Sequence, residues 1–109
     1  MTCQSEALVA TDRPARYGKQ LVAHLSRRNG GEWSDSDQRG WIAFADGRVE
    51  LSCASDGLQL SIQGNPDDLA HLEDVVGRHL VRFGARDELH VRWSRSDGEP
   101  GTAQQSDPD

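Results

Sequence analysis

The chain has 109 residues, 35% of them hydrophobic and 28% charged, with a formal net charge of -6 at pH 7. That length suits one domain, and the acidic balance disfavours nucleic-acid binding, which needs a concentrated basic patch. Because no apolar run approaches the roughly 20 residues of a membrane span and the N-terminus has no basic-then-apolar signal, we expect a cytoplasmic protein that does not bind membranes.

The first part of the chain predicts a strand, a helix and an irregular stretch. Residues 6–11 are typical of a short strand, and residues 12–28 predict an amphipathic helix. Pro14 falls in the first turn of this helix, where its missing N–H does no harm. Residues 29–31 (Asn-Gly-Gly) end the helix. Residues 32–39 are irregular, and we expect a short edge strand followed by a loop.

Residues 40–64 predict three strands joined by two Asp-Gly turns, at positions 46–47 and 56–57. Asp-Gly favours a two-residue hairpin turn, and such a turn fixes the pairing of the flanking strands. In this register Phe44 lies opposite Val49, and the alternation separates an apolar from a polar face. The polar face receives Trp41, Ala43, Arg48, Glu50, Ser52, Gln59, Ser61 and Gln63.

The second hairpin of this meander follows the same logic. Its register places Cys53 opposite Leu60 and Leu51 opposite Ile62, so all four side chains fall on the apolar face. Two independent turns therefore predict the same inside and outside for the three strands.

Residues 65–83 predict a second amphipathic helix, and residues 89–94 a last strand. With about 100° between successive residues, one arc of the helix is apolar. This arc holds Leu69, Leu72, Val76, His79, Leu80 and Phe83. After Gly84 the period switches to two, as a half-buried strand requires. From residue 95 onward no large apolar residue occurs, so we expect a disordered tail.

The order of predicted elements is β-α-(β)-β-β-β-α-β. A sheet that is apolar on one face, combined with two one-sided helices, predicts a two-layer α+β sandwich. We expect a mainly antiparallel sheet with both helices on one face. Residues 1–94 form the single predicted domain, and residues 95–109 the predicted disordered tail.

Several segments carry a resemblance to one bacterial family. They are Tyr17–His24, Phe44–Leu51, Leu72–Val76, Arg78–Phe83 and Val91–Trp93, of which the LEDVV…RHL.RF run is the most specific. The chain resembles a small domain of unknown function that occurs alone and also joined to, or encoded near, siderophore-interacting flavin-dependent ferric reductases.

The resemblance covers about residues 7–93. It implies an association with iron–siderophore metabolism and a protein partner such as the siderophore-interacting reductase, and it implies no catalytic role. The chain departs from the family in a polar stretch at residues 34–38, and its 109 residues hold no counterpart of the reductase.

His24, His79 and Glu73 form one candidate site. Each histidine lies on or beside the apolar arc of its helix, and Glu73 borders the second arc. If the helices lie side by side, a His/His/Glu set suits metal binding or proton transfer. Ordinary packing is the favoured explanation: each ring makes one hydrogen bond at the core edge, and Glu73 pairs with a base of the first helix. The candidate bases are Arg16, Lys19 and Arg28.

The polar sheet face offers a second candidate site. Alternation places Trp41, Arg48, Glu50, His90 and Arg92 on it. An aromatic and charged face without a helix over it suits a protein partner. Alternatively, Trp41 only pads its neighbours, or the irregular stretch before it folds over its ring.

Catalytic motifs are missing from the sequence. It holds no G-x-S-x-G, P-loop or G-x-G-x-x-G motif, and its two widely spaced cysteines form neither a CxxC site nor a disulfide framework. We therefore predict a non-catalytic accessory or protein-interaction domain without a cofactor. The alternative is a small-molecule or metal-binding protein that uses a crevice near His24 and His79.

Overall fold

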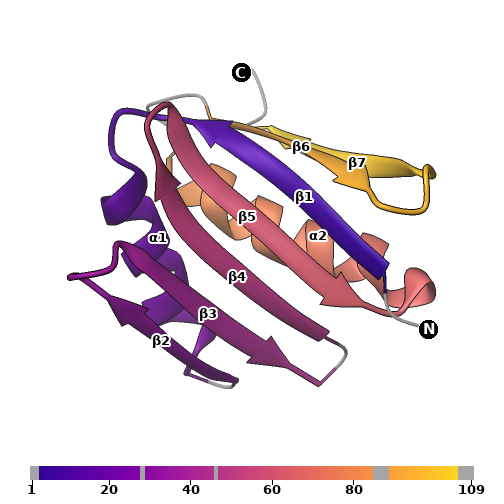
Figure 1. The fold of residues 1–109 in the computed structure, drawn as a ribbon, viewed down its shortest axis with the longest axis horizontal. Helices are drawn as coiled ribbons and strands as arrows, with labels where there is room; N and C mark the ends of the chain where they lie inside the picture. Colours follow the sequence, from indigo (N-terminus) through magenta and orange to yellow (C-terminus); the bar gives the residue numbers. More distant parts are fainter. Residues whose placement is uncertain (1–2, 28, 46, 85–88, 106–109) are drawn as a thin grey trace.

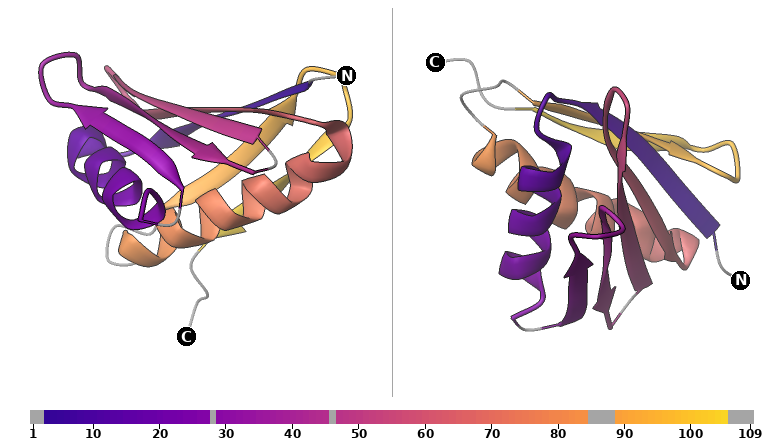
Figure 2. Two further views of the ribbon diagram at one scale, coloured as in Figure 1. Left: turned by 90° about the horizontal axis from the view of Figure 1, so that it is seen from below. Right: turned by 60° about the vertical axis from the view of Figure 1, so that its left-hand side comes forward.

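The structure, a computed structural model, describes residues 3–27, 29–45, 47–84 and 89–105. In these ranges seven strands form one antiparallel sheet, and two helices pack on one of its faces (Figures 1 and 2). The elements in chain order are β1 (Cys3–Ala10), α1 (Pro14–Leu25), β2 (Gly30–Ser34), β3 (Arg39–Phe44), β4 (Gly47–Ala54), β5 (Gly57–Gly64), α2 (Pro66–Phe83), β6 (His90–Arg95) and β7 (Pro100–Gln105).

The strands lie in the order β2-β3-β4-β5-β1-β6-β7. The N-terminal strand β1 is therefore central, antiparallel to both β5 and β6. Helix α1 packs on strands β2 to β5, and α2 packs on β5, β1, β6 and β7. This arrangement confirms the predicted α+β sandwich with both helices on one face. Neither helix in the described part of the chain has the length and hydropathy needed to cross a membrane.

The two hairpins of the meander pair two residues away from the predicted register. Phe44 pairs with Gly47 instead of Val49, and Cys53 pairs with Leu58 instead of Leu60. Because side chains alternate with a period of two, a shift of two residues leaves each of them on its predicted face. The inside and outside of the meander are therefore confirmed although the partners are wrong.

Close backbone contact explains the shift at both glycines. Gly57 lies against the Val9 carbonyl, and a Cβ at Gly57 would collide with it. A Cβ at Gly47 would likewise collide with the Gln63 carbonyl of β5. Neither glycine has a positive φ, so each serves strand packing and not turn geometry. Asp46, the other residue of the first predicted turn, lies outside the described residues.

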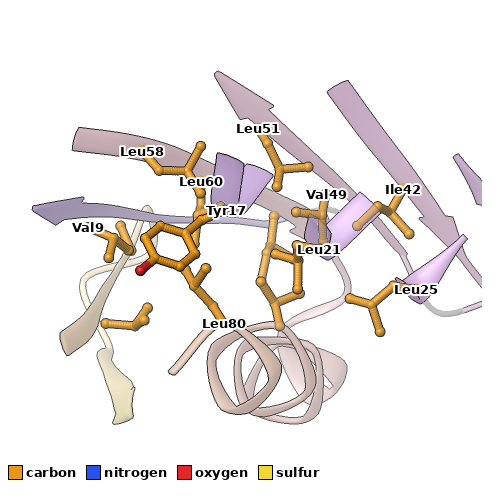
Figure 3. Close-up of a cluster of buried hydrophobic side chains, with 14 of the residues drawn as sticks. Val9, Tyr17, Leu21, Leu25, Ile42, Val49, Leu51, Leu58, Leu60 and Leu80 are labelled. Atoms are coloured by element: carbon orange, nitrogen blue, oxygen red, sulfur yellow. The ribbon is translucent and has the colours of Figure 1, made fainter. Parts of the chain in front are cut away.

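The core fills the space between the sheet and the two helices (Figure 3). Tyr17 of α1 and Leu80 of α2 meet the inward side chains of the strands there. On α2 the buried stripe includes Glu73 and Gly77. His79 is half-buried at its margin.

The segment predicted as a disordered tail contains strand β7, so that prediction is wrong for residues 100–105. The strand pairs with β6 and packs over α2. The Gln104 side chain is buried and accepts a hydrogen bond of 2.7 Å from Trp93 Nε1. Its Cγ lies 2.8 Å from the position a Cβ would take at Gly77. This strand is thus held to the domain by polar side chains. The prediction was wrong because it assumed that a segment without large apolar residues cannot pack on the domain.

Candidate functional site

The sheet face opposite the helices is open, as the edge-on view of Figure 2 shows. A groove of about 450 Å³ runs along this face over strands β2 to β5. Acidic side chains (Glu32, Glu50) and basic ones (Arg39, Arg48) line it together with the Trp41 ring. We call it the Trp41 groove.

A stacked pair stands at the centre of the Trp41 groove. The guanidinium carbon of Arg48 lies 4.8 Å from the centroid of the Trp41 ring. Arg48 is directly opposite Ala43 on β3 and therefore diagonal to Trp41, within the reach of a long side chain. The small Ala43 leaves room for that reach. Arg48 Nε also lies 3.5 Å from Glu50 Oε1, and both of these side chains are about half exposed.

The irregular stretch before β3 forms a wall of the groove instead of a cover. Its first residues are strand β2, in which Glu32 pairs with Trp41. The turn that follows is fixed to β4, because the Cys53 N–H donates to the Gln38 carbonyl at 2.9 Å. Gln38 has a φ of 54°, a left-handed conformation that is uncommon outside glycine. Trp41 remains partly exposed to solvent.

His90 and Arg92 share the open face but lie apart from the groove. Four strand spacings, through β4, β5 and β1, separate β3 from β6, which amounts to about 19 Å. The exposed His90 ring contacts Gln105 of β7, with 3.1 Å between its Nδ1 and the Gln105 side-chain oxygen. The five residues predicted for the polar sheet face thus form two separate groups on that face. Trp41, Arg48 and Glu50 form one, and His90 and Arg92 form the other.

The structure brings His24 and His79 together. Their ring centroids are 4.9 Å apart, and Phe83 meets the His24 ring edge-on at 5.5 Å. A crevice of about 490 Å³ opens beside both rings. Glu73 does not join them, because it points to the other side of α2, towards β7. Within the described ranges no three His, Cys, Asp or Glu side chains are grouped as a metal site, so the predicted His/His/Glu set does not form.

Glu73 is fully buried, and its partners differ from those predicted. Its carboxylate accepts five hydrogen bonds: two from Arg95, two from Thr102 and one from Ser5. The Arg95 bonds are 3.0 and 2.9 Å long and join matching guanidinium and carboxylate edges. The predicted partners Arg16 and Lys19 are not among the donors, and Arg28 lies outside the described residues.

The Glu73 cluster holds the fold together and leaves no oxygen free for chemistry. Burial raises the pKa of Glu73, but the hydrogen bonds from Arg95, Ser5 and Thr102 outweigh burial and hold that pKa below its ordinary value. The group therefore stays ionised at neutral pH. Because both of its oxygens already accept bonds from β1, β6 and β7, Glu73 is neither a general acid nor an available metal ligand.

Comparison with known proteins identifies the family of this chain and a solved structure with the same fold. Residues 6–94 match the model of a family described as an uncharacterized protein conserved in bacteria, DUF2218. The chain belongs to this family. The NMR structure of PA4090 from Pseudomonas aeruginosa matches with a TM-score of 0.66 and 27% identity, over 86% of this chain and 96% of that one. A search of curated proteins finds no match.

The DUF2218 match confirms the resemblance to a small bacterial domain of unknown function. The family's description says nothing of siderophores or reductases, so that part of the resemblance stays a proposal. The match ends before Arg95 and does not include β7. Two of the residues that bind Glu73, Arg95 and Thr102, therefore lie beyond the matched region.

Proposed function

We propose that this DUF2218 domain is a non-catalytic protein-interaction domain and that a partner protein docks on the Trp41 groove. The stacked Trp41–Arg48 pair carries the proposal. Tryptophan and arginine are the side chains that most often supply the binding energy of an interface. Here the pair is partly exposed, and no helix covers it.

The chemistry of the groove favours a protein over a small molecule. Small-molecule sites are enclosed and mostly apolar, whereas acidic, basic and hydroxyl side chains line this open groove. Protein interfaces instead surround an aromatic anchor with a polar rim. A footprint of about 800 Å² on each partner is also wide enough to include the second group on this face, His90 and Arg92.

The partner we propose is the siderophore-interacting ferric reductase, which would give the domain a role in bacterial iron–siderophore metabolism. The resemblance of residues 72–83 to the reductase-associated domain supports this choice. The groove carries charges of both signs, so the complementary surface should present both an acid for Arg48 and a base for Glu50.

Isothermal titration calorimetry with the purified full chain and the siderophore-interacting reductase of the same bacterium tests the proposal. The wild type should bind, and Trp41→Ala should raise the dissociation constant at least tenfold, a loss of about 1.4 kcal/mol. Arg48→Ala should act in the same direction. Arg78→Ala is the matched control, because Arg78 is an exposed arginine of α2 on the helical side of the molecule and should leave binding unchanged.

Two results would contradict different parts of the proposal. If the wild type does not bind the reductase, the proposed partner is wrong. If it binds and Trp41→Ala binds equally well, the partner is right but the proposed face is wrong.

A further inference from the structure

A second site lies on the helical side of the molecule, between the two helices. His24 is in the last turn of α1, and His79 is on α2. Their ring centroids are 4.9 Å apart and their planes are tilted by 43°. Both rings, with Arg27 and Asn29, line the crevice of about 490 Å³, so an ion from solvent can reach them.

Hydrogen bonding leaves ring nitrogens available in the crevice. His79 Nδ1 lies 2.7 Å from the Val75 carbonyl oxygen. A carbonyl only accepts, so this nitrogen carries the proton, and in the neutral ring Nε2 keeps its lone pair. A backbone bond of this kind is also what orients metal-binding histidines. His24 is exposed and makes no hydrogen bond within the described part of the chain.

The spacing of the rings suits a shared metal ion. Two imidazoles bound to one Zn²⁺ at about 2.0–2.1 Å, with bond angles of about 90–110°, have ring centroids about 4.5–5.3 Å apart. The observed 4.9 Å lies within this range without movement of either helix. We propose that His24 and His79 bind a divalent transition-metal ion that bridges α1 and α2, with Zn²⁺ as the probe ion. This site is independent of the Trp41 groove.

The surroundings of the rings set the kind of ion and limit its affinity. The C-terminal end of α1 carries the negative pole of the helix dipole, which favours a cation. Imidazole ligands select zinc, copper or nickel and not magnesium. In the described ranges only two protein ligands are present, so water would complete the coordination. Arg27 lines the same crevice and opposes a cation, which makes its replacement informative.

The test is a thermal-unfolding titration of the full chain, free of any histidine tag, with Zn²⁺ and with Mg²⁺. Because the ion binds the folded state, Zn²⁺ at a hundredfold excess over its dissociation constant should raise the melting temperature by about 14 °C. Mg²⁺ should have no effect. His24→Gln and His79→Gln should each abolish the Zn²⁺ shift, and His71→Gln should retain it, because His71 is exposed elsewhere on α2.

Arg27→Gln distinguishes a cation site from an anion site in the same crevice. Removing this positive charge should tighten Zn²⁺ binding, seen as a lower Zn²⁺ concentration at half the thermal shift. A titration with inorganic phosphate that stabilises the wild type, and fails to stabilise Arg27→Gln, would instead show an anion site and overturn the proposal. So would a Zn²⁺ shift that is absent in the wild type or that survives in His24→Gln. Because His24 is exposed, we expect His24→Gln to fold like the wild type.

Discussion

Two arginine–glutamate pairs lie on opposite sides of the sheet and behave differently. Arg95 Nη2 is 2.9 Å from Glu73 Oε1, and the exposed fractions of these side chains are 13% and 0%. On the open face Arg48 Nε is 3.5 Å from Glu50 Oε1, and the exposed fractions are 47% and 56%. The first pair has every oxygen bonded within the protein. The second still presents its charges to solvent.

This contrast separates the part of the fold that provides stability from the part that is available for recognition. Strands β1, β6 and β7 converge on Glu73 through Ser5, Arg95 and Thr102, so breaking that pair disturbs three strands and a helix. Breaking the Arg48–Glu50 pair disturbs nothing buried, because water replaces the lost contact. The buried pair therefore serves the fold, and the exposed pair is available to a partner.

The largest expected effect comes from neutralising Glu73. Glu73→Gln should lower the free energy of unfolding by about 3 kcal/mol, because Arg95 is left without its counter-charge in a largely buried place. Asp74→Asn is the matched control on the next residue of α2. Asp74 and Arg78 are also 2.9 Å apart, but both are exposed, so the loss should stay below about 0.5 kcal/mol. Denaturant unfolding measures both, and equal losses would contradict the contrast.

Removal of β7 should have the next largest effect. Deleting residues 100–109 takes away Thr102 and Gln104, and with them the bonds to Glu73 and to the Trp93 indole N–H. We expect a loss of about 2 kcal/mol, or a fall in melting temperature of about 10 °C. A melting temperature that stays unchanged on deletion would mean that the strand contributes nothing to stability.

The pH dependence of stability should also reveal the contribution of the Glu73–Arg95 pair. A carboxylate whose pKa is lowered from its ordinary value of 4.5 on folding stabilises the protein above that value. Its contribution is lost as the pH falls through the still lower pKa of the folded state. The difference in unfolding free energy between the wild type and Glu73→Gln should therefore be full at pH 7 and shrink below pH 4.5. A difference that stays constant on acidification would argue against an ionised Glu73.

Trp41→Ala should lower stability much less than Glu73→Gln or the deletion of β7. The ring lies on the open face and loses mainly its contact with Arg48, which is worth about 0.5–1 kcal/mol at an exposed site. Chemical denaturation should show a loss within that range. A loss like that of Glu73→Gln would mean that Trp41 belongs to the core and not to an interaction surface.

Side-chain alternation and helical periodicity were sufficient to predict both layers and the inward faces of the three meander strands and of β6. The sequence did not reveal the register, because Gly47 and Gly57 looked like turn residues. Each lies within a strand, against a neighbouring residue that leaves no space for a Cβ. Close approach between distant segments cannot be seen in a local pattern.

The candidate sites were predictable to different degrees. The contact between His24 and His79 followed from two helix arcs and was anticipated, as was the polar face that carries Trp41. The sequence placed Glu73 at the margin of the apolar arc of α2, whereas in the structure Glu73 is one of the fully buried residues of that helix. Its partner was missed because Arg95 begins a stretch without large apolar residues, and strand β7 is docked by Thr102 and Gln104. A carboxylate within an apolar arc was the only sign that a buried base existed.

The most direct test of the central claim is an NMR titration of the ¹⁵N-labelled chain with the unlabelled siderophore-interacting reductase. If the open face is the interaction surface, the amide signals that shift or broaden should cluster on β3 and β4 around Trp41 and Arg48. The signals of α1, α2 and the Glu73 cluster should move little. Changes centred on the helices, with β3 and β4 unaffected, would contradict the assignment of recognition to the open face.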